Sequence, residues 1–124
     1  MRRALVVLLM VAVPVGSAVL PAGTAGAAPA YTGPCHAAVD VHWPANLRPW
    51  AHRIVQRESR GVPTAVNRRA VGRYGRASGC FQMLPGYAAP YLRAAGCGSL
   101  LDASCSARSA LALYRKAGAR PWRV

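Results

Sequence analysis

Acidic residues are scarce in this sequence. The chain of 124 residues has three Asp and Glu residues against sixteen Lys and Arg residues, which gives a formal net charge of +13. Glu58 is the only glutamate. Such a basic excess predicts anionic partners, which outside a cell are wall polymers, membrane surfaces or free nucleic acid. Charge alone does not choose among the three.

The sequence also lacks cysteines and histidines at the separations that metal sites use. The chain has no C-x-x-C pair, and its three histidines (His36, His42 and His52) do not stand at ligand spacing from the cysteines. This excludes the common zinc arrangements. We therefore expect no metal and no organic cofactor.

The four cysteines are better explained as disulfides, because the N-terminal residues described below predict export, and an exported chain meets an oxidising environment. Cys97 and Cys105 bracket a short loop that contains Gly and Ser, so we expect these two to pair. Cys35 and Cys80 then pair by elimination.

No stretch of useful length alternates apolar and polar residues, and the chain has no internal repeat and no appended binding module. These absences exclude an extensive β-sheet. The predicted fold is a small, single, all-α domain over residues 31–124, with about three helices and long loops.

Apolar spacing and capping residues predict where the helices lie. The first runs over residues 47–59 with Asn46 as N-cap, the second over residues 86–95, and the last from a cap at Asp102 or Ser104 to residue 117. Residues 31–44 show little periodicity and are expected to form an irregular arm, and residues 61–79 a long arginine-rich loop.

The N-terminus has the layout of a secretory signal peptide. Residues 1–3 are positively charged, residues 4–20 are apolar, and residues 21–30 are small and flexible, with small-residue cleavage sites after Ala27 and after Ala30. A membrane anchor is the alternative, but a proline and a glycine interrupt the apolar run. We expect residues 1–30 to be removed and the domain to be secreted and associated with the cell wall.

Glu58 stands out by position as well as by rarity. It follows Val55 by three residues and Ile54 by four, so it continues the apolar stripe of the first predicted helix. Partial burial favours the neutral form of a carboxyl group, and a protonated carboxyl is what general-acid cleavage of a glycosidic bond needs. The alternative is a structural glutamate paired with a neighbouring arginine.

Three segments, which follow one another along the chain, support a catalytic role for Glu58. Residues 57–67 read RESRGVPTAVN, residues 79–85 read GCFQMLP, and residues 101–122 contain the last predicted helix with a closing Pro-Trp. The first two resemble the E-S-x-x-x-P-x-A-x-N and G-L-M-Q-x-x-P segments of soluble lytic transglycosylases and goose-type lysozymes. The third resembles the closing helix of short secreted actinobacterial members of that family. The family's A-Y-N-x-G segment is not visible in this chain.

The resemblance implies a lysozyme-like fold that cleaves the β-1,4 bond between N-acetylmuramic acid and N-acetylglucosamine in peptidoglycan. It implies that Glu58 is the acid and base, and that Ser59 helps to arrange the acid and the sugar. It also implies that Asn67 and Gln82 lie at the substrate cleft, although a turn residue and a satisfied buried amide are the respective alternatives. Tyr114 is a further candidate to bind substrate, with core packing as its alternative.

A second carboxylate, as two-acid glycosidases require, could come only from Asp40 or Asp102. Asp102 is expected to cap a helix, and nothing in the sequence places Asp40. The single-acid route is therefore favoured, in which Glu58 activates either the sugar's own 6-hydroxyl or a water molecule. Tyr74 and Trp122 have flat rings suited to stacking on sugar, although such rings more often serve simple packing.

The competing hypothesis is a protein without catalysis that binds anionic wall polymers or membranes by charge. It predicts that Glu58 is dispensable and that salt abolishes binding. Nucleic-acid binding is disfavoured, because no groove-reading motif is present. We expect a monomer whose partners are peptidoglycan strands and anionic wall polymers, without stable membrane insertion.

Overall fold

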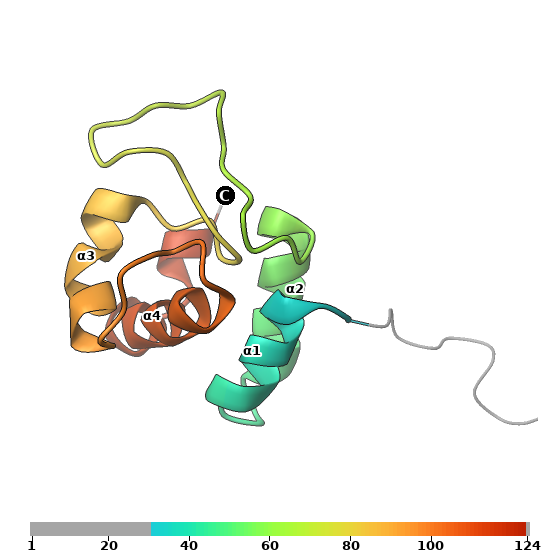
Figure 1. Ribbon diagram of the computed structural model, residues 1–124. Coiled ribbons are helices and arrows are strands. Elements are labelled where there is room, and N and C mark those ends of the chain that lie inside the picture. Colours follow the sequence, from blue (N-terminus) through green and yellow to red (C-terminus); the bar gives the residue numbers. More distant parts are fainter. Residues whose placement is uncertain (1–30, 124) are drawn as a thin grey trace, which may run out of the picture.

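The computed structural model describes residues 31–123. The predicted signal peptide, and the membrane anchor that is its alternative, lie outside the described residues. Within them, the elements follow in the order α1 (Pro34–His42), α2 (Arg48–Ser59), α3 (Pro85–Ala94), α4 (Ala103–Ala117) and the short 3₁₀ helix η1 (Arg120–Trp122), as Figure 1 shows. The β structure in this part of the chain is limited to three isolated bridges. The all-α prediction is therefore confirmed, with one helix more than expected.

The additional helix is α1, and the prediction of an irregular arm over residues 31–44 was wrong. A proline occupies the first turn of α1, where its missing N–H is tolerated. The helix packs against both α4 and α2 and buries Cys35, His36, Ala38 and Val39. Because its inward face includes a histidine and tertiary packing stabilises so short a helix, local apolar periodicity did not reveal it.

The boundaries of α2 agree with prediction, but its start does not use the expected cap. Leu47 occupies the N-cap position and no side chain caps the helix, so the assignment of Asn46 as N-cap was wrong. The backbone turns instead through Pro44, whose carbonyl accepts from the N–H groups of Leu47 and Arg48. Pro49 lies in the first turn, as expected.

The last two helices also lie where the sequence predicted. α3 contains Pro90 within its length. Asp102 caps α4, since its Oδ1 accepts from the backbone N–H of Cys105 at 2.8 Å. Ser104, the other candidate cap, instead bonds to Nε2 of His42 at 2.7 Å.

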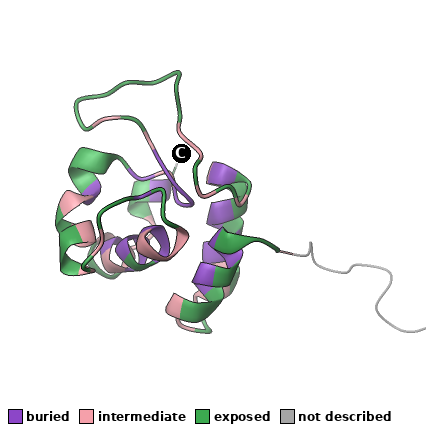
Figure 2. Ribbon diagram, in the orientation of Figure 1, coloured by how far each residue is buried: buried purple, intermediate pink, exposed green. Residues whose placement is uncertain are grey.

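An aromatic cluster forms the centre of the core. Trp43 stacks on Phe81 with ring centroids 5.4 Å apart, and Trp50 and Trp122 meet edge to face at 5.5 Å. Trp43, Phe81 and Trp122 are almost fully buried. Figure 2 shows buried residues where α1, α2 and α4 face one another and in residues 78–81, whereas the loop over residues 61–77 is exposed or half-buried.

Both predicted disulfides are present, Cys35–Cys80 and Cys97–Cys105. The first joins α1 to the segment before α3, and the second joins the loop after α3 to the first turn of α4. None of the helices among residues 31–123 is both long and apolar enough to cross a membrane.

Candidate active site

Glu58 lies one residue before the end of α2, where the backbone turns sharply. Arg60 has a left-handed backbone with φ 53°, and Gly61 follows with φ 78°. This turn ends the helix directly after Glu58 and Ser59. The Glu58 side chain is 25% exposed, in agreement with its predicted place beside the apolar stripe.

A second segment, residues 79–82, is held in place by its own sequence. Gly79 has φ +82°, and a Cβ at this position would lie 2.0 Å from the carbonyl oxygen of Leu100. Both the backbone conformation and the lack of space require glycine. The glycine of the second motif is therefore explained by a close backbone approach.

The next two residues of this segment anchor it to α1 and to the core. Cys80 is bonded to Cys35, and the fully buried Phe81 stacks on Trp43. Gln82 follows with a left-handed backbone at φ 50°. A covalent bond and an aromatic contact thus fix the backbone from which the Gln82 side chain projects.

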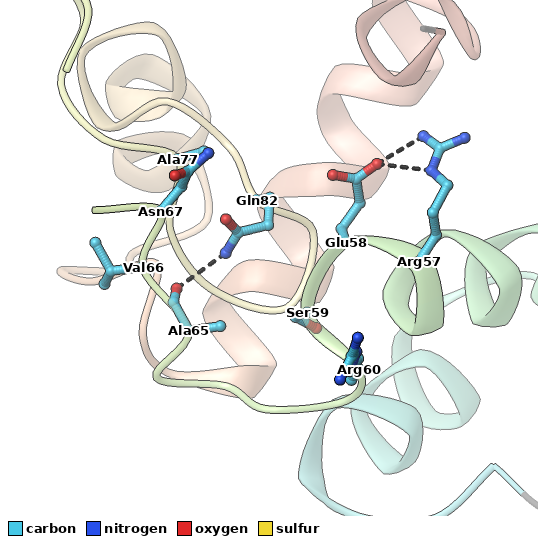
Figure 3. A pocket seen from close by; sticks show the side chains of 9 residues that line it. All are labelled: Arg57, Glu58, Ser59, Arg60, Ala65, Val66, Asn67, Ala77 and Gln82. Carbon is cyan, nitrogen blue, oxygen red and sulfur yellow. Dashed lines mark hydrogen bonds and ion pairs between the residues drawn. The ribbon is translucent and has the colours of Figure 1, made fainter. Parts of the chain in front are cut away.

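Glu58 and Gln82 line the same hollow, which has a volume of about 380 Å³. Its walls are the end of α2 with the residue that follows it (residues 57–60), residues 65–67, Ala77 and Gln82. Figure 3 shows the Glu58 and Gln82 side chains on two sides of this space. The two sequence motifs, separated by a long loop, therefore meet at one site.

Hydrogen bonds tie the two motifs together behind the hollow. The carbonyl oxygen of Ala65 accepts from the N–H of Gly79 at 2.8 Å and from Nε2 of Gln82 at 2.9 Å. Nε2 of Gln82 also donates to the carbonyl oxygen of Gly79 at 3.0 Å. The amide nitrogen of Gln82 is thus structural, whereas its Oε1 accepts no hydrogen bond from residues 31–123 and is available to a ligand.

Arg57 holds one oxygen of the Glu58 carboxylate. Its Nε and Nη2 donate to Oε1 of Glu58 at 2.8 and 2.6 Å, and Nη2 also donates to the carbonyl oxygen of Trp122. The ion pair that the sequence offered as an alternative to catalysis is therefore present. Oε2 of Glu58 has no hydrogen-bond partner within the described part of the chain, so one carboxylate oxygen is oriented and the other is open.

Ser59 and Asn67 also border the hollow, but both side chains serve the local backbone. The hydroxyl of the buried Ser59 donates to the carbonyl oxygen of Val55 at 3.1 Å, within the helix. Oδ1 of Asn67 accepts from the N–H of Arg69 at 3.0 Å, a local turn typical of asparagine. The Ser59 hydroxyl and Oδ1 of Asn67 are therefore bonded to nearby backbone, although both residues line the hollow.

Tyr114 does not line this hollow. Its ring packs 4.8 Å from that of Trp50 and 5.6 Å from that of Trp43, measured between centroids, so its surroundings match the core-packing alternative. Trp122 is 6% exposed and its Nε1 donates to the carbonyl oxygen of Phe81 at 3.0 Å.

The other acids of the chain do not join the site. Asp40 lies on α1 and bonds to His52, and Asp102 caps α4. Glu58 is therefore the only acid among the residues that line the hollow. No group of three or more His, Cys, Asp or Glu residues that could hold a metal ion occurs within residues 31–123.

A second hollow of about 540 Å³ was not predicted from the sequence. The half-exposed rings of Tyr74 and Tyr87 line it, together with Leu84, and the buried Met83 and Trp122 form part of its wall. Gln82 and Met83 are consecutive, so the same short segment borders both hollows. The signal for it in the sequence is a pair of tyrosines on either side of the second motif, Tyr74 before it and Tyr87 after it.

Comparison of the chain with protein-family models, curated proteins and solved structures gave no match.

Proposed function

We propose that the protein cleaves the glycan strands of peptidoglycan at the β-1,4 bond between N-acetylmuramic acid and N-acetylglucosamine, with Glu58 as acid and base. In this proposal the domain is lysozyme-like and acts outside the cell, at the wall. The observation that carries it is the meeting of two motifs at one hollow, where the only glutamate of the chain faces Gln82.

The reaction uses the two oxygens of Glu58 differently. The protonated carboxyl gives its proton to the glycosidic oxygen, and the bond from this oxygen to the anomeric carbon breaks. The carboxylate then removes a proton from the sugar's 6-hydroxyl or from water while that oxygen attacks the anomeric carbon. Arg57, bonded to Oε1, orients the carboxylate so that Oε2 carries the proton. No second acid lines the hollow, which favours this single-acid route.

The second hollow offers room for the neighbouring sugars of the strand. The exposed rings of Tyr74 and Tyr87 give flat apolar surfaces, and Arg120 adds a cation next to them. In this proposal the strand extends from Gln82 toward Leu84 and these rings, because consecutive residues of one short segment border the two hollows. This path suits a polymeric substrate better than a single small molecule.

The proposal is tested by digesting purified peptidoglycan with the disulfide-bonded protein and identifying soluble fragments by mass spectrometry. We expect muropeptides to be released. Fragments lighter by one water than the hydrolysis products would show attack by the 6-hydroxyl, and ordinary fragments would show attack by water. If no soluble fragments appear over a range of pH and salt concentration, the proposal is wrong.

A second candidate function, binding to anionic wall polymers without catalysis, is favoured by the largely exposed loop over residues 66–77, here called the basic loop. Arg68, Arg69, Arg73 and Arg76 are all exposed on it, and no acidic residue occurs between Glu58 and Asp102. Retention on walls that is lost in high salt and unaffected by Glu58→Gln, without release of fragments, would identify this function.

A further inference from the structure

A polar cluster centred on two buried histidines lies between α1 and α2, and none of its residues lines the two hollows described above. The histidine cluster consists of Tyr31, His36, Asp40, His52 and Gln56. His36 and His52 are 2% and 9% exposed. Their Nδ1 atoms face each other at 2.8 Å, so the two rings are hydrogen-bonded directly to one another.

Each histidine has a second partner at its other nitrogen. Nε2 of His52 lies 2.8 Å from Oδ1 of Asp40, and Nε2 of His36 lies 3.3 Å from Oε1 of Gln56. The Tyr31 ring stacks on both imidazoles, with centroids 4.7 Å from His36 and 4.9 Å from His52. The result is a continuous chain from Asp40 through both histidines to Gln56, with Tyr31 as its cover.

The geometry limits how many protons this series of hydrogen-bonded side chains can hold. Asp40 accepts from His52, so Nε2 of His52 carries a proton, and the neutral ring accepts at Nδ1. His36 must then donate through its own Nδ1. One further proton fits on Nε2 of His36, where it would point at Oε1 of Gln56. A proton on Nδ1 of His52 as well would bring two N–H groups face to face at 2.8 Å, which the folded arrangement cannot accommodate.

We propose that the histidine cluster is an acid-sensitive latch that fastens α1 and the chain preceding it to α2, and that it opens when both imidazoles become protonated. Opening separates the two imidazole rings on which the Tyr31 ring stacks. It also removes the His36 ring from Gly61, where an added Cβ would meet the ring at 3.3 Å. Because Gly61 directly follows Arg60, which lines the Glu58 hollow, acid loosens one wall of that hollow.

The surroundings of His36 also disfavour its protonated form in the folded protein. The pKa of His36 is lowered, first because burial penalises the charged ring and further by the neighbouring His52, against the hydrogen bond of Gln56 and the charge of Asp40, which raise it. The titratable groups that face the ring are Asp40 of α1, His52 of α2 and Tyr31 of the preceding segment, while the loop after α2 presents only Gly61.

The sign of the effect on stability follows from proton counts. Below the ordinary pKa of histidine, about 6.5, His36 binds more protons in the unfolded chain than in the folded chain, because its pKa is lowered in the fold. Stability is therefore highest above that pH and falls as pH decreases toward the lowered pKa of His36. The Cys35–Cys80 bond keeps α1 attached while the latch opens. None of this requires Glu58 to be catalytic.

The test follows thermal unfolding of the disulfide-bonded protein from about pH 7.5 to about pH 5. His36→Asn keeps a donor near the Nδ1 position but takes up no proton. His42→Asn is the matched control, because His42 is bonded to Ser104 and lies outside the cluster. We expect the melting temperature of the wild type and of His42→Asn to fall together on acidification by several degrees, and that of His36→Asn to fall by half as much or less. Equal falls in all three proteins would overturn the latch.

A measurement on the wild type alone guards against a His36 variant that does not fold. In nitrogen-resolved NMR at neutral pH, we expect one imidazole proton shared between the Nδ1 atoms of His36 and His52. Its signal should disappear on acidification together with the ordering of the Tyr31 ring, while the core tryptophan signals stay unchanged. If both imidazoles become fully protonated with Tyr31 still ordered on them, the latch does not exist.

Discussion

Two residues with unusual backbones border the Glu58 hollow. Arg60 and Gln82 are the only non-glycine residues of the described chain with positive φ, at 53° and 50°, and both line the hollow. A left-handed backbone costs a residue with a side chain about 1 kcal/mol or more. Such residues persist only where surrounding contacts enforce them, and at Gln82 these contacts are two hydrogen bonds to backbone carbonyls. Strain gathered at one hollow supports its assignment as the functional site.

Replacing Gln82 separates its structural role from its role at the site. Gln82→Ala and Gln82→Gly both lose the two hydrogen bonds, but glycine accepts the left-handed backbone. We expect Gln82→Gly to be about 1 kcal/mol more stable than Gln82→Ala in chemical denaturation, and both to lose wall-cleaving activity. Activity retained in either variant would remove Gln82 from the site.

Gly79 provides a sharper test of the second motif. Gly79→Ala combines a left-handed backbone with a backbone clash at 2.0 Å, whereas Gly96→Ala at φ +67° has no atom within 4 Å of the new Cβ. We expect Gly96→Ala to cost about 1 kcal/mol and Gly79→Ala about 3 kcal/mol or more. Equal losses in the free energy of unfolding would mean that residues 79–82 shift easily.

At the scale of elements, the sequence predicts helices where capping and apolar spacing agree. The start of α4 follows from Asp102, and the end of α2 from Gly61 and the proline after it. α1 could not be predicted in this way, because its inward face includes His36 and its main packing partner is α4, which is distant in sequence. Asn46 failed as a cap because a turn at Pro44 starts α2 instead. Local signals thus placed the elements, whereas tertiary contacts decided the site's surroundings.

The motif residues show the same difference between what local sequence indicates and what tertiary contacts decide. The sequence singled out Glu58 and Gln82, and both line the hollow. Nothing local indicated that Arg57 bridges Glu58 to the backbone of Trp122, which is 65 residues later in the sequence. The histidine cluster was missed for the same reason, since its two rings come from different helices.

The two disulfides should differ in their effect on stability. Cys35 and Cys80 are 45 residues apart, and Cys97 and Cys105 are 8 apart. Loop-closure entropy predicts a loss of about 4 kcal/mol for the paired Cys35→Ala and Cys80→Ala change and about 2.5 kcal/mol for Cys97→Ala with Cys105→Ala. Chemical denaturation of the two double variants measures this order, and the reverse order would contradict it.

At the scale of the whole molecule, charge and catalysis are separable. Residues 31–124 carry 14 Lys and Arg against 3 Asp and Glu, so cationic attraction to a wall acts whether or not Glu58 cleaves it. The basic loop concentrates four of these arginines on one exposed segment, and Asn67 and Ala77 of the same loop line the Glu58 hollow.

Replacing the four arginines of the basic loop by Gln should weaken retention on anionic walls several-fold more than removing the same charge elsewhere. A matched control replaces four other exposed arginines, which are Arg53, Arg93, Arg115 and Arg123. Co-sedimentation with walls over a salt series measures the difference, which should shrink as salt screens both proteins. Equal weakening would mean that net charge alone governs binding.

The most direct test of the central claim is the rate at which purified peptidoglycan suspensions lose turbidity with wild type, Glu58→Gln and Asp102→Asn. Asn also caps helices, so Asp102→Asn removes a carboxylate while keeping the cap on α4. We predict wild-type rates for Asp102→Asn and a fall of about 100-fold or more for Glu58→Gln, the size of effect expected when a general acid is lost. Clearing by Glu58→Gln at the wild-type rate would contradict the assignment of Glu58 as the catalytic acid.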